Sequence, residues 1–527
     1  MFESLSQDAL PSGSKIFKDF IINRQSQNYS AIDELFINLK ENNYDRDCLI
    51  RAITDSHNII QFDDLQSVNV SKLKNLDTFA VVTGQQAGFL GGPLYTLLKA
   101  LDTVKISNDL SIRYPDYNFV PIFWIEDNDN DVNEVASSKI FDEHGDPKTY
   151  SLYVEANKTV AKCTVRESDN GQIAEVCAMF DSLYPNGNEV SEWLREIYTE
   201  GKSWSSAFTE VLNRLCKNTG LLFLSADRLI QTGIFSELLA KELSEPGFTR
   251  TLIEKSNQKL IENGHHIQAQ ASEINLFYHT GEQRHRIEFS DGKFISDDLV
   301  FSADEFISLV HESPNLFSPK VLLRPIFQDY AIPTVAYLAG PGEIAYHSQI
   351  VDLYSYFGVI KPKLLMRTNL TCIDKKSVRY LSKLDIEPQY FFRKFSLIEH
   401  EIADKLLGER HEEIFHDFRE HFEKNFKELE KYLLTIDSQL ERSITTAQSK
   451  IIEQIEQLDK KAHALAKRNN EELLSKYKYL HNFLFPNSNY QEREISALYF
   501  YAISEGFINK LNDLKYKIDG SHVFLEL

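Results

Sequence analysis

Four short apolar segments, each followed by a polar or glycine-rich loop, constrain the fold of this chain more than any other feature of its sequence. The segments are 79–82, 120–125, 221–224 and 334–338. Helical patterns follow the first and the last of them, beginning near Pro93 and Ile344. Apolar strands that alternate with helices are typical of a parallel sheet covered on both faces. Ligands of such sheets bind at the carboxyl ends of the strands, which is where these loops lie.

The spacing of these segments predicts an α/β core that is discontinuous in sequence. We expect the core to comprise residues 76–135, 206–239 and 321–384, preceded by an N-terminal helical segment over 1–75. Two insertions interrupt it, at 136–205 and 240–320. The first insertion is expected to contain a β-hairpin over 149–165, and the second mixes helix with alternating runs such as 286–289.

Residues 385–527 form a helical C-terminal region in this interpretation. Ile444, Ile451, Leu458 and Leu465 are spaced by sevens, and no Pro or Gly occurs between Gly408 and Pro486. This pattern predicts one or two long helices in a coiled coil, within the chain or between two chains. An ordinary helical bundle is the alternative. The aromatic residues 499–501 indicate that the tail packs back on a core.

The composition restricts the classes of partner. The chain has 527 residues, with 78 acidic and 57 basic side chains and a net charge of −21. Such a surface repels phosphate backbones, so nucleic acid is not expected as a partner, although a local pocket for one nucleotide is compatible with it. The five cysteines are scattered without zinc spacing, which is typical of reduced thiols. With no signal peptide or membrane span recognised, we expect a cytoplasmic protein that does not bind membranes.

The glycine-rich loop after the first apolar segment is a candidate anion-binding turn. It contains Gly84, Gly88 and Gly92 and precedes a helix, whose positive N-terminal end attracts anions. It matches neither the Walker A pattern nor GxGxxG. Gln85 and Gln86 add amides that both donate and accept hydrogen bonds. The alternative is a tight turn with no ligand.

An acidic run follows the second apolar segment. Residues 126–131 contain four carboxylates, of which Asp129 and Asp131 are the best candidates for chemistry. Carboxylates at a strand end bind Mg²⁺, orient an ammonium group, or act as a general base. A solvated acidic turn is the alternative interpretation.

The fourth apolar segment repeats the strand, loop and helix design. Gly340 and Gly342 allow close approach of backbone to a ligand, and Glu343 falls in the first helical turn, where it could equally be a cap. Arg324, with Gln328 nearby, is suited to a bidentate contact with a carboxylate. Its alternative is an ordinary ion pair with one of the many acids.

Taken together and in order, these motifs resemble the bacillithiol biosynthesis cysteine-adding enzyme family, BshC. The segments that carry the resemblance are 83–88, 92–96 with Lys99, 121–124 with its acidic tail, 264–268, 275–278 with Arg284 and Arg286, 322–325 with Gln328, 339–346, Arg367, 484–486 and 491–493. They extend over nearly the whole chain.

The resemblance implies a Rossmann-like core similar to class I nucleotidyltransferases, two connecting insertions, and a coiled-coil domain that forms a homodimer. It implies a ligase that adds L-cysteine to the amine of glucosaminyl-malate, the last step to the low-molecular-weight thiol bacillithiol. Because amide formation from a carboxylate and an amine is uphill in water, we expect ATP or another nucleotide to drive it. Mg²⁺ is a candidate companion ion, and no resident metal site is expected.

Together, the motifs and the resemblance give a set of candidate site residues. Catalysis is assigned to Asp129 and Asp131, substrate binding to Gln85, Gln86, Tyr95, Arg324, Gln328, Glu343, Tyr346 and Arg367, and phosphate or anion binding to Gly84, Gly88, Gly92, Gly340 and Gly342. In this assignment, Arg324 and Arg367 bind the malyl carboxylates or stabilise phosphate charge.

The sequence departs from the family at two positions. The usual acidic motif is Glu-Asp-His-Asp, whereas this chain has Asn at 130, and Lys320 stands where Asn is usual. The missing histidine supports one alternative, a non-catalytic coiled-coil scaffold with a Rossmann-like core. A nucleotidyltransferase of the same fold is the other alternative.

Overall fold

The computed structural model describes residues 4–5, 18–20, 32–57, 60–155, 158–181, 184–408, 410–517 and 520–527. Of the expected N-terminal helical segment, it contains the helices α2 (Ile32–Glu41), α3 (Arg46–Ser56) and α4 (Asp64–Lys72). Most of residues 1–31 lie outside the described residues. The chain divides into two compact units, Met1–Glu143 with Pro147–Lys375 and Gln491–Leu527, and His144–Asp146 with Lys376–Tyr490.

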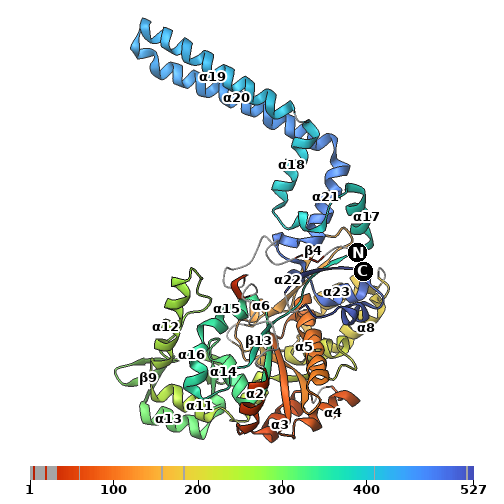
Figure 1. Ribbon diagram of the computed structural model, residues 1–527, viewed down its shortest axis with the longest axis vertical. Coiled ribbons are helices and arrows are strands. Elements are labelled where there is room, and N and C mark those ends of the chain that lie inside the picture. Colours follow the sequence, from red (N-terminus) through yellow and green to blue (C-terminus); the bar gives the residue numbers. More distant parts are fainter. Residues whose placement is uncertain are drawn as a thin grey trace. The chain divides into compact units, whose positions relative to one another are not determined.

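A five-stranded parallel sheet forms the centre of the first unit (Figure 1). Its strands, in spatial order, are β13 (Lys363–Met366), β12 (Thr334–Ala339), β1 (Thr78–Gln86), β2 (Asn118–Glu126) and β5 (Leu222–Ser225). All five lie within the three segments expected for the core, although β13 itself was not predicted. The predicted Rossmann-like α/β class is therefore confirmed.

Helices cover both faces of this sheet because successive side chains of each strand point to opposite faces. Phe79 and Val81 pack in one cluster with α2 and α5 (Leu94–Arg113). Ala80 and Val82 pack in another with α3 and α14 (Arg324–Ala331). Burial on both faces explains why these strands are continuous apolar runs rather than alternating ones.

The register of the strands brings their carboxyl ends to one edge. Gly84 is paired with Trp124 and Gln86 with Glu126, so the ends of β1 and β2 coincide. A Cβ atom at Gly84 would lie 3.0 Å from the carbonyl oxygen of Trp124. This close approach requires glycine at position 84 for packing, independently of any ligand.

The first insertion combines helices with a short antiparallel pair of strands. Its helices are α7 (Asn170–Asp181) and α8 (Gly187–Ile197), while α6 (Val132–Ala136) precedes it and α9 (Trp204–Leu215) follows it. The expected hairpin over 149–165 is wrong: the antiparallel pair is β3 (Ser137–Phe141) with β4 (Pro147–Ser151). The turn between these strands contains Gly145, whose φ of +86° suits a reversal that alternation alone does not locate.

The second insertion combines helices with two small antiparallel sheets. Its elements are α11 (Ser236–Ser244), α12 (Phe248–Glu262), α13 (Ala303–Glu312), the sheet of β6 (Leu276–Thr280), β7 (Gln283–Arg286) and β11 (Phe317–Pro319), and the sheet of β8 (Glu288–Ser290), β9 (Lys293–Ser296) and β10 (Leu299–Ser302). The helix α10 (Ala226–Gln231) precedes it, and α14, α15 (Pro341–Gln349) and α16 (Val351–Phe357) follow it.

The C-terminal residues return to the first unit, as the aromatic tail indicated. Strand β15 (His522–Glu526) pairs in parallel with β14 (Asn369–Ile373). The helices α22 (Gln491–Glu494), α23 (Ala497–Ile503) and α24 (Phe507–Asp513) each contact α5. Thus residues 491–527 belong with the core rather than with the long helices.

The second unit consists of α17 (Lys375–Leu384), which begins at the boundary of the units, α18 (Phe395–Leu407), α19 (Arg410–Ile436), α20 (Glu441–Asn469) and α21 (Glu471–Leu484). The turn Ser438–Leu440 joins α19 to α20, and the two helices run antiparallel side by side (Figure 1). The coiled-coil prediction is therefore confirmed, with an intrachain pair. Ile444 and Ile455 are buried, whereas Leu458 is 60% exposed.

Among the described helices, none is long and apolar enough to cross a membrane. All five cysteines are buried and unpaired. This agrees with the expectation of reduced thiols that pack as small apolar side chains.

Candidate active site

A cavity of about 830 Å³ lies at the carboxyl ends of the central strands. Twelve of the predicted site residues line it: Gly84, Gln85, Gln86, Tyr95, Asp129, Asp131, Arg324, Gly340, Gly342, Glu343, Tyr346 and Arg367. Three do not: Gly88, Gly92 and Gln328. The glycine turns and the acidic run, which are far apart in sequence, thus enclose one common space.

Asp129 is held from two sides at the end of β2. The side-chain amide of Gln86 donates to Asp129 Oδ2 over 2.8 Å, and a guanidinium N–H of Arg284 donates to Asp129 Oδ1 over 2.8 Å. Arg284 also donates to the carbonyl oxygen of Asn128 and to Asn130 Oδ1, and its guanidinium stacks on the ring of Phe277. These contacts fix the acidic loop against the second insertion and stabilise the negative charge of the Asp129 carboxylate.

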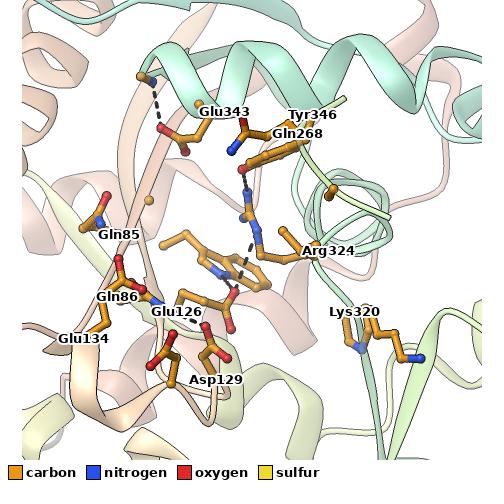
Figure 2. A pocket seen from close by; sticks show the side chains of 18 of the residues that line it. Gln85, Gln86, Glu126, Asp129, Glu134, Gln268, Lys320, Arg324, Glu343 and Tyr346 are labelled. Atoms are coloured by element: carbon orange, nitrogen blue, oxygen red, sulfur yellow. Dashed lines mark hydrogen bonds and ion pairs between the residues drawn. The ribbon is translucent and has the colours of Figure 1, made fainter. Parts of the chain in front are cut away.

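Arg324 and Glu126 form a second ion pair in the cavity. Figure 2 shows Arg324 between Glu126 and Tyr346. The Trp124 indole donates to Glu126 Oε2 over 2.9 Å, and Arg324 Nε lies 3.9 Å from that oxygen. Arg324 also donates to the Tyr346 hydroxyl over 2.8 Å. Burial raises the pKa of the Glu126 carboxyl, and the Arg324 guanidinium opposes that rise.

The third pair connects α5 to α15. Lys99, buried in the second turn of α5, forms an ion pair with the carboxylate of Glu343 and donates to the carbonyl oxygen of Gly84 over 2.6 Å. The Tyr337 hydroxyl donates to Glu343 Oε1 over 2.6 Å, and the Gly340 N–H donates to Glu343 Oε2 over 2.7 Å. Lys99 holds the pKa of Glu343 below its usual value against the effect of burial. Glu343 therefore both caps the helix and lines the cavity.

Two of the predicted anion-binding glycines have a structural role instead. The Gly88 N–H donates to the carbonyl oxygen of Gln86, and the Gly92 N–H donates to that of Phe89. The first N–H of α5, from Leu94, donates to the carbonyl oxygen of Ile495. With these donors engaged inside the protein, the geometry does not support an anion site on this part of the loop.

Gln328 is the third predicted residue that lies outside the cavity. Its side chain is completely buried on α14, where it accepts a hydrogen bond from Arg324 over 3.1 Å and donates to Asp329 over 3.0 Å. We therefore correct its role from substrate contact to positioning of Arg324.

The charge of the cavity has the opposite sign to that of the whole chain. Seven basic and five acidic side chains line it. The basic residues are Lys99, Arg284, Arg286, Lys320, Arg324, Arg367 and Arg493, and the acidic residues are Glu126, Asp129, Asp131, Glu134 and Glu343. A net positive cavity in a chain of net charge −21 attracts an acidic ligand to this place.

Three of these cations have no carboxylate within ion-pairing distance among the described residues: Arg286, Lys320 and Arg493. The ammonium group of Lys320 donates to the carbonyl oxygen of Ile274 over 2.9 Å. Burial lowers the pKa of Lys320 to about 8, and the nearby Arg286 adds to this effect. A bound carboxylate or phosphate would supply the counter-charge that these groups lack.

Several cavity residues were absent from the predicted site. Lys99, Gln268, Arg284, Arg286 and Arg493 lie in the resembling segments, but the sequence assigns them no role. Glu126 lies in the acidic run but is not among its best candidates, and Glu134 lies outside every motif. The sequence held one usable signal for Lys99: a lysine among the apolar residues of a helix needs a buried carboxylate partner. Nothing comparable marks Glu134 or Gln268.

Two family models together match nearly the whole chain. The model described as "Bacillithiol biosynthesis BshC, N-terminal Rossmann-like domain" matches residues 7–368. The model described as "Bacillithiol biosynthesis BshC, C-terminal coiled-coil domain" matches residues 370–527.

Curated relatives match over most of their length. A protein of Flavobacterium psychrophilum is 29% identical over 496 residues, which cover 92% of this chain and 89% of the relative. One of Salinibacter ruber is 26% identical, with 86% and 84% covered, and one of Chlorobium phaeobacteroides is 30% identical, with 85% and 83% covered. All three carry the name "Putative cysteine ligase BshC".

Proposed function

The chain belongs to the BshC family of bacillithiol biosynthesis, and from this premise we propose that it is an ATP-dependent ligase that joins L-cysteine to glucosaminyl-malate. The bond formed is an amide between the cysteine carboxyl and the amine of the sugar. In this proposal the reaction is the last step to bacillithiol, and it takes place in the cytoplasm.

The observation that carries the proposal is the charge of the cavity. The acceptor carries two malyl carboxylates and a nucleoside triphosphate carries several phosphate charges, and seven basic side chains line the cavity of a chain whose net charge is −21. The volume of about 830 Å³ falls in the range typical of sites for small metabolites and cofactors. Arg286 and Lys320, which have no carboxylate partner among the described residues, are the best candidates to bind the malyl group.

The acidic loop supplies the groups that handle amines. Asp129 is held by Gln86 and Arg284, so its carboxylate is fixed in position and can orient an ammonium group. The Asp131 carboxylate lines the same cavity and has no hydrogen-bond or ion-pair partner among the described residues. We assign Asp131 as the general base that takes the proton from the acceptor ammonium, because only the neutral amine attacks an activated carboxyl group.

The start of α15 is the candidate position for phosphate groups. Gly340, Pro341 and Gly342 line the cavity at the N-terminal end of this helix, where the helix dipole is positive. The Gly340 N–H is already bound to the Glu343 carboxylate, so we assign the phosphate contact to the N–H of Gly342. Arg367 and Arg493 line the same cavity. This proposal replaces the predicted anion site at Gly88 and Gly92.

Mg²⁺ fits the cavity only as a companion of the nucleotide. Among the described residues, no three His, Cys, Asp or Glu donors converge in the cavity. Mg²⁺ is commonly held by one or two carboxylates together with substrate phosphates, and Glu134, which lines the cavity, is an oxygen donor of this kind. Bound there, the ion would neutralise phosphate charge.

The test is a reaction of the purified protein with L-cysteine, glucosaminyl-malate, ATP and Mg²⁺, with bacillithiol measured by mass spectrometry. Formation of bacillithiol that depends on all three substrates supports the proposal. Absence of product with every nucleoside triphosphate would contradict it. Release of pyrophosphate without incorporation of cysteine would instead favour a nucleotidyltransferase.

Asn130 offers a test of the non-catalytic alternative. Its side-chain oxygen accepts a hydrogen bond from Arg284 over 3.0 Å, so the residue stabilises the acidic loop without a titratable group. The proposal expects measurable turnover in the parent protein. An inert parent whose Asn130→His variant is also inert would favour a scaffold.

We propose that the chain forms a homodimer through the pair α19 and α20. Large apolar side chains remain exposed on both helices, including Ile414, Phe418 and Tyr432 on α19 and Ile451, Leu458 and Leu465 on α20. Large apolar side chains that remain exposed on a helix pair are candidates for an association surface. A second copy of the same pair carries the matching heptads.

A further inference from the structure

A cluster of three histidines and two aspartates lies in the second unit, where α18, α19 and α20 meet. Its members are His400 and Asp404 on α18, His411 on α19, and Asp459 and His463 on α20. On two of the helices the members are four residues apart, which places them on one face of the helix. The proposed ligase reaction makes no use of this cluster.

His463 is the centre of the cluster, and both of its ring nitrogens face oxygen. Nδ1 lies 2.9 Å from the backbone carbonyl oxygen of Asp459 and 3.3 Å from its Oδ1. A carbonyl oxygen can only accept, so Nδ1 carries the hydrogen. Nε2 lies 2.8 Å from Asp404 Oδ1, and the His400 Nε2 lies 3.7 Å from Asp404 Oδ2.

This arrangement requires a positive charge between His463 and Asp404. With its hydrogen on Nδ1, a neutral His463 would turn the lone pair of Nε2 toward a carboxylate oxygen, and two acceptors at 2.8 Å repel each other. Either a second proton on the ring or a metal ion removes this repulsion. An Nδ1–H bound to a backbone carbonyl is also the usual support of a histidine that binds metal through Nε2.

We propose that His463 Nε2, the carboxylate of Asp404 and His400 Nε2 bind a divalent transition-metal ion of the Zn²⁺ class. The donor atoms of these three residues all lie within 4.8 Å of one another. Ligands about 2.0–2.1 Å from a tetrahedral Zn²⁺ ion lie roughly 3.3 Å apart, so the contact between His463 and Asp404 opens by about half an ångström on binding. Water completes the coordination, because His400 and Asp404 are exposed.

The remaining two members position the ligands. The backbone carbonyl of Asp459 orients His463. The side-chain carboxylate of Asp459 accepts a hydrogen bond from His411 Nε2 over 2.8 Å, and Arg419 lies 3.5 Å from it. With two neighbours already engaged, the Asp459 carboxylate is the less available donor. The ion would join α18 to α20 next to Gly408, whose φ of +86° marks the end of α18. Its role is to stabilise this junction.

The experiment is a calorimetric titration of the full-length protein with ZnCl₂ at pH 7.5, alongside His463→Gln and a matched control, His416→Gln. His416 is an exposed histidine on α19, in a separate group with Asp417 and Glu420. We expect the wild-type protein and H416Q to bind one ion alike. H463Q should bind it at least tenfold more weakly, as loss of metal-site partners typically does.

Three outcomes overturn the proposal: no binding of Zn²⁺ to the wild-type protein, equal binding by H463Q, or loss of binding in H416Q. The first means that only a proton lies between His463 and Asp404. Circular dichroism verifies that H463Q is folded, and Asp404→Asn provides a second variant that should weaken binding in the same way. The cavity variant Asp131→Asn must retain this binding, which separates the junction from the proposed active site.

Discussion

The ammonium group of Lys99 and the carboxylate of Glu343 form an ion pair in the wall of the cavity, although the two residues belong to different strand–helix units of the core. Lys99 is 1% exposed. The pair therefore ties α5 to the start of α15 and sets the distance between two loops that line the site.

Replacing Lys99 by Met should destabilise the protein strongly. The change leaves the Glu343 carboxylate, which is 18% exposed, without its counter-charge, at a cost of up to about 3–5 kcal/mol. Chemical denaturation of the purified variant measures the free energy of unfolding. The double variant K99M/E343Q should recover part of the loss, since no charge remains unpaired. A K99M protein as stable as the parent would show that the pair does not form.

Replacing Asp131 by Asn should lower kcat about 100-fold if Asp131 is the general base, because such groups contribute roughly 10²–10⁴-fold. KM for cysteine should change little. Asp116→Asn, at an exposed position away from the cavity, is the matched control and should retain full activity. Full turnover by D131N, measured as bacillithiol formed per minute, would refute this assignment.

Replacing Lys320 by Met should raise KM for glucosaminyl-malate about tenfold, since a hydrogen bond to a charged group contributes roughly 1.5–3 kcal/mol. KM for cysteine should stay the same. Lys293→Met removes an exposed lysine of β9 and serves as control. An equal rise of KM for both substrates would indicate that K320M disturbs the cavity in general, rather than one acidic ligand.

The free energy of unfolding should decrease as the pH rises from about 4.5 to 7, in part because of Glu242. Burial raises the pKa of Glu242 from 4.5 to about 7. Between these values the folded state binds more protons than the unfolded state. The contribution of Glu242 to the free energy of unfolding is therefore fully present below pH 4.5 and is lost as the pH rises to 7. Glu242→Gln should reduce the total change in the free energy of unfolding across this pH range by up to about 3 kcal/mol. An unchanged slope in urea denaturation curves would contradict the shifted pKa.

Replacing Leu458 by Glu should dissociate the proposed dimer. The side chain is 60% exposed on α20, and a charge buried in a coiled-coil seam is strongly unfavourable. Light scattering coupled to gel filtration measures the mass. Gln457→Glu adds the same charge at the neighbouring exposed position and should leave the mass at that of the parent. A monomeric parent would refute the dimer itself.

The sequence predicted the local elements well where apolar periodicity was long or turn chemistry was specific. The strands β1, β2, β5 and β12 lie where the apolar runs indicated, and the heptads of α20 marked the long helices. The hairpin of the first insertion was misplaced, because short alternating runs do not identify which turn closes them. The order of the motifs along the chain was also sufficient to indicate the family.

Only the tertiary structure decided which polar groups meet. It paired Arg284 with Asp129, which are 155 residues apart, and Lys99 with Glu343. It also turned Gln328 into the core and engaged the N–H groups of Gly88 and Gly92 within the protein. The physical reason is the distance along the chain over which each interaction acts. Periodicity and turn preferences act over a few residues, whereas an ion pair forms when strand register and packing bring distant charges together.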